Sequence, residues 1–134
     1  MKNIIFLLSL LPILLTAGVK TLSVEEVEKL KKQKVPIIDI RTPQEWKSTG
    51  IIPGSRLIMF FDERGGYDLN RFMKEFAKVV PSKDMPFVLV CRTGSRTKVV
   101  GNFLADKLGY KKAADLGGGI YAWIRSKKPV KAVK

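Results

Sequence analysis

Two kinds of segment alternate along this chain, and they differ in the spacing of their hydrophobic residues. Short runs of β-branched and other apolar residues, VPIIDI, SRLIMFF and MPFVLV, are typical of strands, and KKAADL is a weaker example. Between them, segments such as LNRFMKEFAKVV and RTKVVGNFLADKL repeat apolar residues at the spacing of a helix face. The order of these segments predicts an α/β fold: a central, mainly parallel β-sheet flanked by α-helices on both faces.

Capping signals show where two of the helices begin. Ser23 is followed by Glu26, and Thr42 is followed by a proline and then by Glu45. A hydroxyl residue with glutamate three positions later satisfies the free amides of a first helical turn, and proline is favoured at the first helical position. We therefore expect one helix after Ser23 and a short one that begins after Thr42 and ends at Gly50.

The first residues differ from the rest of the chain. Lys2 precedes the apolar run IIFLLSLLPILL, and the small residues Thr16, Ala17 and Gly18 follow it. This is the pattern of a secretory signal peptide, and the run is shorter than the roughly twenty residues of a membrane-spanning helix. We expect residues 1–18 to be a signal peptide, with an uncleaved anchor as the alternative. Residues 19–134 would then form a single domain that is periplasmic or secreted.

Composition narrows the chemistry that this domain can support. The 134 residues include 25 Lys and Arg against 12 Asp and Glu, and the net charge of +13 attracts anions. The basic residues are scattered along the sequence without interleaved aromatic residues, so we expect no nucleic-acid partner. The chain has no histidine and one cysteine, which excludes a Cys–His catalytic pair and a cysteine–histidine zinc site. We expect neither a metal nor a cofactor.

The single cysteine, Cys91, stands where the predicted strand MPFVLV ends. A lone cysteine is most simply a small buried apolar residue. However, a glycine-bearing loop with two arginines and a helix start follow it, and ligand sites of α/β proteins lie at the carboxyl ends of strands. Arginines and helix amino termini favour the thiolate. We predict a nucleophile in an anion-binding loop whose substrate-binding residues are Arg92, Thr93, Gly94, Ser95, Arg96 and Thr97.

The spacing of the loop argues against two other cysteine chemistries. Cysteine-dependent phosphatases resemble the pattern C-x5-R, whereas position six after Cys91 is Thr97 and the arginine, Arg96, comes one residue earlier. An arsenate reductase needs a further cysteine to resolve a disulfide, and this chain has only one. The shorter loop suits a sulfur atom attached to Cys91 better than a phosphate.

Three motifs in order resemble the rhodanese (thiosulfate sulfurtransferase) family: IIDIRTPQEWKSTGIIPGS, VLVCRTGSRT and LGGGIYAW. The resemblance implies a single rhodanese-like domain in which catalytic Cys91 takes a sulfur atom from thiosulfate or a similar anionic donor. The resulting persulfide would pass its sulfur to cyanide, a thiol or a protein acceptor. Arg92 and Arg96 would orient the donor and stabilise its charge. The chain departs from the family pattern at Ile51, where many relatives carry histidine.

Asp39 and Arg41 end a neighbouring predicted strand, and we expect them to support the site. Arg41 would pair with Glu45, and Asp39 would accept hydrogen bonds from loop amides. The glycine triplet of LGGGIYAW would make a tight turn near the loop. A second functional hypothesis stays open: a periplasmic carrier of polysulfide or persulfide sulfur that serves a redox partner. This hypothesis rests on the predicted signal peptide and on the net positive charge of the chain.

Overall fold

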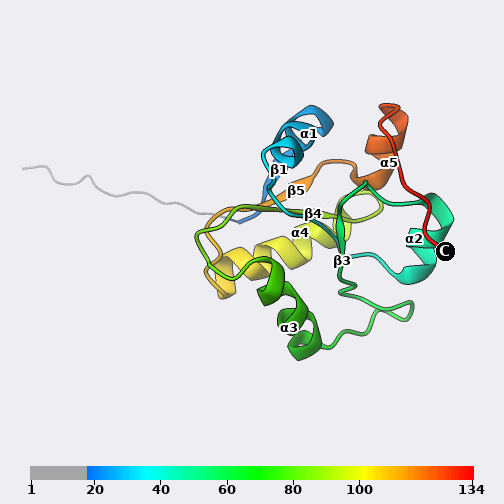
Figure 1. The fold of residues 1–134 in the computed structure, drawn as a ribbon. Helices are drawn as coiled ribbons and strands as arrows, with labels where there is room; N and C mark the ends of the chain where they lie inside the picture. The colour runs from blue at the N-terminus through cyan, green and yellow to red at the C-terminus, as the bar shows by residue number, and fades with distance from the viewer. Residues whose placement is uncertain (1–17) are drawn as a thin grey trace, which may run out of the picture.

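The computed structural model describes residues 18–134, so the predicted signal peptide lies outside the described residues except for Gly18. A five-stranded sheet forms its centre (Figure 1). All strand pairs in this sheet are parallel, which confirms and sharpens the predicted mainly parallel sheet. In spatial order the strands are β1 (Lys20–Leu22), β5 (Ala113–Leu116), β4 (Phe87–Val90), β2 (Ile37–Asp39) and β3 (Arg56–Leu57).

The helices begin where the capping signals predict. Ser23 and Glu26 form a reciprocal capping box at the start of α1, and Thr42 and Glu45 form another at the start of α2. Gly50 ends α2, as expected. The helices are α1 (Val24–Lys32), α2 (Pro43–Thr49), α3 (Leu69–Val79), α4 (Ser95–Asn102), which continues as the π-helical turn η2 (Phe103–Lys107), and α5 (Gly119–Arg125).

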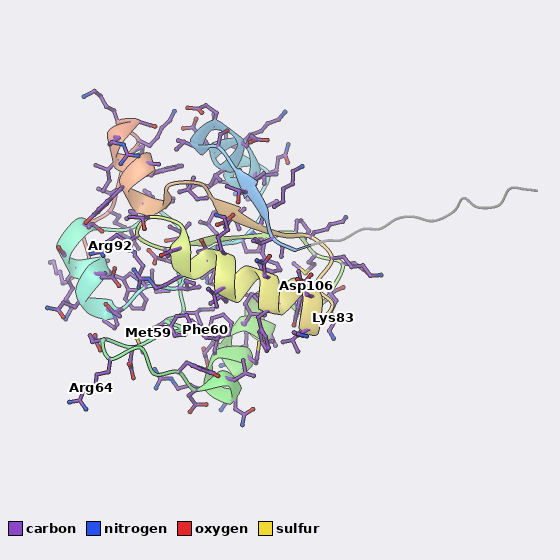
Figure 2. All side chains as sticks on the ribbon, turned by 180° about the vertical axis from the view of Figure 1, so that it is seen from behind. Met59, Phe60, Arg64, Lys83, Arg92 and Asp106 are labelled. Atoms are coloured by element: carbon purple, nitrogen blue, oxygen red, sulfur yellow. The ribbon has the colours of Figure 1, made fainter. Side chains whose placement is uncertain are left out.

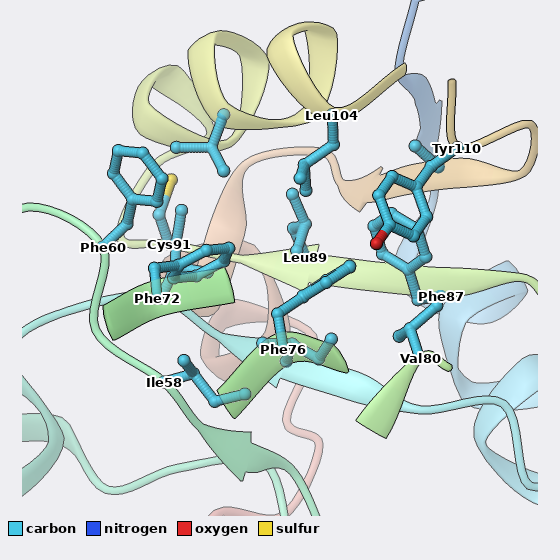
Figure 3. Packing of buried hydrophobic residues seen from close by; sticks show 14 residues of the cluster. Ile58, Phe60, Phe72, Phe76, Val80, Phe87, Leu89, Cys91, Leu104 and Tyr110 are labelled. Carbon is cyan, nitrogen blue, oxygen red and sulfur yellow. The ribbon is translucent and has the colours of Figure 1, made fainter. Parts of the chain in front are cut away.

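The sheet separates two apolar cores, and this explains why its central strand, β4, is apolar and buried at every position. Successive side chains of a strand point to opposite faces. Val88 and Val90 therefore pack with α1 and α5, whereas Phe87, Leu89 and Cys91 pack with α3 and α4 (Figure 3). The prediction of helices on both faces is confirmed.

Two segments differ from the expectation. The predicted strand SRLIMFF is reduced to Arg56–Leu57, although the amides of Ile58 and Phe60 still donate to carbonyls of the β2 segment. β3 is an outermost strand of the sheet, so it pairs with β2 only. The short strand β1 had no predicted counterpart. Within residues 18–134, no helix is sufficiently long and apolar to span a bilayer.

Candidate active site

Cys91 begins the loop that joins the central strand β4 to helix α4. The loop turns at Gly94, whose φ of 106° lies in the left-handed region that glycine adopts readily. The Gly94 amide donates a hydrogen bond to Cys91 Sγ at 3.1 Å. Ser95 then begins α4, which brings a helix amino terminus to the same loop. A hydrogen-bond donor and a helix amino terminus both favour negative charge at the sulfur.

The Cys91 side chain is completely buried, with 0% of its surface exposed. It belongs to the same apolar cluster as Phe60, Phe72 and Val100 (Figure 3). In this conformation a reagent contacts the sulfur only if neighbouring groups move. Burial alone fits a small apolar residue, whereas the Gly94 amide directed at the sulfur fits a nucleophile.

Thr97 and Asp115 form a buried polar pair beside the sulfur. Thr97 Oγ1 lies 3.6 Å from Cys91 Sγ. The same hydroxyl lies 2.7 Å from Asp115 Oδ2 and 3.0 Å from the Gly94 carbonyl oxygen, and both of these atoms can accept its hydrogen. Lys98 Nζ also donates to Asp115 Oδ2, at 2.8 Å. The hydroxyl has one hydrogen, and the carboxylate and the carbonyl only accept. That single hydrogen can point to Asp115, to the Gly94 carbonyl or to the sulfur, so either atom of the Thr97–Cys91 contact can be the donor.

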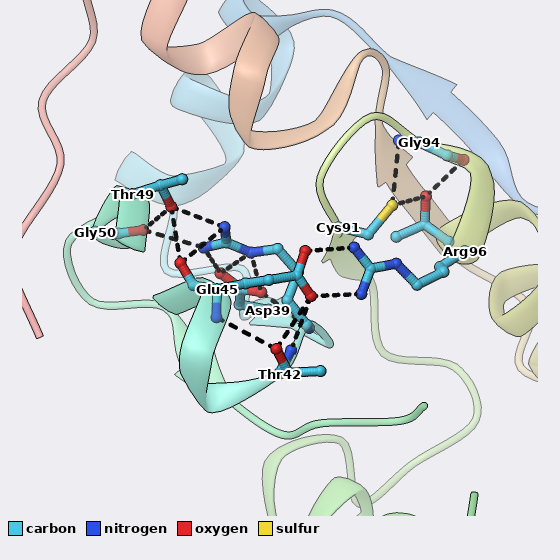
Figure 4. Close-up of polar contacts among 10 residues, drawn as sticks. Asp39, Thr42, Glu45, Thr49, Gly50, Cys91, Gly94 and Arg96 are labelled. Carbon is cyan, nitrogen blue, oxygen red and sulfur yellow. Dashed lines mark hydrogen bonds and ion pairs between the residues drawn. The ribbon is translucent and has the colours of Figure 1, made fainter. Parts of the chain in front are cut away.

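Arg96 makes a two-bond ion pair with Glu45 rather than an open anion site (Figure 4). Both N–O distances are 2.7 Å. The Arg96 hydrogen bonds lower the pKa of Glu45 from 4.5 to about 2, and Glu45 raises the pKa of Arg96. The expected Arg41–Glu45 pair is wrong, because Arg41 Nη1 reaches only the main-chain oxygen of Glu45, at 3.5 Å. The Glu45 carboxylate points instead to α4.

Asp39 and Arg41 form a buried ion pair whose side chains are 1% and 0% exposed. Asp39 accepts from Arg41 Nη2 at 2.8 Å and from the Arg41 amide at 3.1 Å. The guanidinium also donates to Thr49 Oγ1 at 2.8 Å and to the Gly50 carbonyl at 3.0 Å (Figure 4). The pair thus ties the end of β2 to the end of α2, the helix that carries Glu45. The role of Asp39 and Arg41 in supporting the site stays a prediction.

A hollow of about 630 Å³ opens beside the loop. Arg92 lines it and is exposed, and its guanidinium lies 6.0 Å from the centre of the Tyr121 ring. Within residues 18–134, Arg92 makes no ion pair. Thr93 and Ser95 are also exposed. The charged groups of the hollow are Glu45, Asp62, Glu63, Arg92 and Arg96.

The glycine-rich turn before α5 packs directly on the Cys91 loop. Gly119 has a φ of 61°, and a Cβ there would lie 2.5 Å from the Cys91 carbonyl oxygen and would also overlap the carbonyl of Arg92. The amide of Ile120 donates to the Cys91 carbonyl at 2.9 Å, and the amide of Tyr121 donates to the Arg92 carbonyl at 3.3 Å. The triplet therefore allows the close approach that fixes the loop.

The sequence from residue 23 to residue 126 matches the family described as the rhodanese-like domain. The matched region holds every residue of the Cys91 loop and the α5 turn against it. The chain belongs to the rhodanese-like domain family. This confirms the resemblance seen in the three sequence motifs.

Known relatives of this rhodanese-like chain include sulfurtransferases. "Adenylyltransferase and sulfurtransferase MOCS3" from Drosophila persimilis is 26% identical over 104 residues, and the match spans 74% of this chain but only 21% of that protein. A thiosulfate sulfurtransferase from Pseudomonas aeruginosa has a TM-score of 0.67 at 19% identity, over 87% of this chain and 21% of that one. The polysulfide-sulfur transferase homodimer from Wolinella succinogenes has a TM-score of 0.64 at 22% identity, over 87% and 80%. These two structures show the shared fold.

Two acidic residues at the site were not predicted as site residues. Asp115 lies in an otherwise apolar strand, β5, and a lone acidic residue in such a run is the signal that marks it. Glu45 was assigned to the α2 cap and to Arg41, and it does cap the helix while it also binds Arg96. Within residues 18–134, no group of three or more His, Cys, Asp or Glu residues could hold a metal ion.

Proposed function

We propose that this rhodanese-like domain transfers sulfane sulfur from thiosulfate or a similar anionic donor to a thiophilic acceptor through a Cys91 persulfide. The Cys91 thiolate attacks the outer sulfur of thiosulfate, the bond between the two donor sulfurs breaks, and sulfite leaves with the bonding electrons. The acceptor, for example cyanide, then attacks the outer persulfide sulfur and leaves as thiocyanate. The Cys91 thiolate is regenerated without an external oxidant or reductant.

The observation that carries the proposal is the Gly94 amide at 3.1 Å from Cys91 Sγ. It gives the sulfur a donor that stabilises negative charge in a chain that has no histidine to act as a base. The exposed Arg92 guanidinium lines the hollow beside the loop and is the loop arginine that can attract the anionic donor, although Asp62 and Glu63 line the same hollow. The charge of Arg96 is already compensated by Glu45. The names of the sulfurtransferase relatives support the same reaction class.

A cyanide-dependent assay with thiosulfate tests the proposal. We expect thiocyanate production by the wild-type chain and none above background by Cys91→Ser, with parallel initial-rate lines that indicate a ping-pong mechanism. Ser126→Ala, at an exposed position after α5 and outside the loop, is the control and should retain activity. Equal rates for the wild type and Cys91→Ser would end the proposal.

The complete burial of Cys91 favours a second candidate function, a sulfur carrier. A persulfide enclosed by Phe60, Phe72 and Val100 is shielded from water and small oxidants until a partner opens the site. The name of the Wolinella succinogenes relative suggests polysulfide as the donor. Mass spectrometry after exposure to polysulfide should then show one added sulfur on Cys91 that persists for longer than thiosulfate turnover takes. Rapid loss of that sulfur without an acceptor argues against a carrier.

We further propose export, on the basis of Lys2, the apolar run that follows it and the small residues Thr16, Ala17 and Gly18. The protein would then be periplasmic or secreted and would meet its donor and any redox partner there. Fractionation of native cells followed by amino-terminal sequencing tests this. Recovery of the chain in the cytoplasm with an intact amino terminus contradicts it.

A further inference from the structure

Basic side chains gather at the edge of the sheet that is opposite to Cys91. Because all five strands are parallel, the residues that precede the strands lie at one edge and the Cys91 loop lies at the other. An exposed basic residue begins or closely precedes every strand. In chain order these residues, which we call the basic edge, are Lys20, Lys34, Arg56, Lys83, Lys111 and Lys112.

Two hollows at this edge bring the basic residues together. The first, of about 410 Å³, is lined by Gly18, Lys20, Lys111 and Lys112, among others. The second, of about 320 Å³, lies where β2 and β3 begin, and its charged lining residues are Lys31, Lys34 and Arg56.

Few carboxylates offset these charges. Asp84 pairs with Lys111 at 3.4 Å in a highly exposed contact, which is worth little in water. Asp106 accepts the Gly18 amide at 3.0 Å. The edge therefore keeps a net positive charge. Lys83 and Asp106 lie on one side of the molecule and Arg92 lies on the other (Figure 2).

The described chain also begins at this edge. Gly18 lines the same hollow as Lys20, and its amide is fixed by Asp106. The apolar run that ends at Leu15 is joined to Gly18 through only two residues. In the sequence, a strongly apolar segment therefore directly precedes residues that belong to a positive surface. Apolar burial and attraction to anionic headgroups together give stable membrane attachment where either alone is weak.

We propose that, in the chain that keeps residues 1–18, the basic edge binds the anionic headgroups of a lipid bilayer, and that the Cys91 loop faces away from the membrane. The positive surface matches the negative surface potential of such a bilayer. The adjoining apolar run selects a bilayer over a nucleic acid, which has no apolar interior to receive it. The proposal does not depend on the sulfur chemistry of Cys91.

Vesicle flotation with the full chain tests the proposal. Binding is compared on phosphatidylcholine vesicles and on vesicles that also contain phosphatidylglycerol, so that the apolar run contributes to both and the difference reports the charged surface. Lys111→Glu/Lys112→Glu should reduce the phosphatidylglycerol-dependent part of the affinity about 25-fold at low salt. The matched control, Lys47→Glu/Lys127→Glu, makes the same change of net charge with exposed residues outside the basic edge and should change it less than about threefold.

Three results would overturn the proposal. The first is equal affinity of the wild type for both vesicle types, and the second is an equal loss in the two double variants, which would mean that only net charge matters. The third is tighter binding to a short DNA duplex than to anionic vesicles at the same salt, with the same sensitivity to Lys111→Glu/Lys112→Glu. Circular dichroism melting of both double variants checks that they remain folded.

Discussion

Glu45 and Arg96 lie 51 residues apart in the sequence, and their two-bond ion pair joins the first turn of α2 to the first turn of α4. The pair has two consequences. It holds the end of the loop that begins at Cys91. It also compensates the positive charge of Arg96, one of the two loop arginines. Arg92 is left as the loop arginine that lines the hollow without an ion pair within residues 18–134.

The Glu45–Arg96 pair predicts how stability depends on pH. The folded-state pKa of Glu45 is about 2, below its ordinary value of 4.5, so its contribution is present above pH 4.5 and is lost as pH falls from there through about 2. Glu45→Gln should melt below the wild type at neutral pH, and the difference should shrink as pH falls. Glu75→Gln, which removes an exposed pair with Lys78, is the control and should change little. Parallel melting profiles for Glu45→Gln and the wild type would contradict the prediction.

The close approach of Gly119 to the Cys91 loop predicts a large steric effect. Gly119→Ala places a Cβ within 2.5 Å of the Cys91 carbonyl oxygen at a φ of 61°. We expect a loss of about 3 kcal/mol in the free energy of unfolding and a strong loss of sulfur transfer. Gly65→Ala has a similar φ of 81° but no atom near the new Cβ, so it should cost about 1 kcal/mol. Similar losses from both substitutions in urea denaturation would refute the steric explanation.

The hydrogen bond between Thr97 and Asp115 predicts energetic coupling. Asp115 is buried and accepts from the hydroxyls of Thr21 and Thr97, so Asp115→Asn should cost about 2 kcal/mol. Thr97→Val removes one partner of the same bond. The double variant should be less destabilised than the sum of the single variants by about 1 kcal/mol. Additive values in denaturant unfolding would show that the two residues act independently.

The exposed position of Arg92 predicts that its substitution changes the binding of thiosulfate but not the stability of the fold. Its guanidinium is exposed and makes no ion pair within residues 18–134, so Arg92→Ala should leave the melting temperature unchanged. The KM for thiosulfate should rise about fivefold with little change in kcat, and this difference should diminish in salt. Arg125→Ala, on the exposed side of α5, is the control. An unchanged KM in the Arg92→Ala variant would count against this role.

Local sequence patterns predicted much of the fold because their physical causes lie within a few residues. The capping boxes at Ser23 and Thr42 each close within three residues of the chain. The apolar run before Cys91 similarly indicates a strand that is buried on both faces, and it placed the thiol at the end of the central strand. The three-residue strand β1 is too short to show a period, and it depends on pairing with β5, so it was missed.

The sequence by itself determined that a lone thiol ends a buried strand, that no histidine assists it, and that glycine and two arginines follow. Only the tertiary structure decided that Glu45 binds Arg96, that Asp115 orients Thr97, and that Cys91 is fully buried. It also gathered lysines that are scattered along the sequence onto one edge of the sheet. The physical reason is that these contacts join segments far apart in the chain, and their meeting depends on the order and direction of the strands.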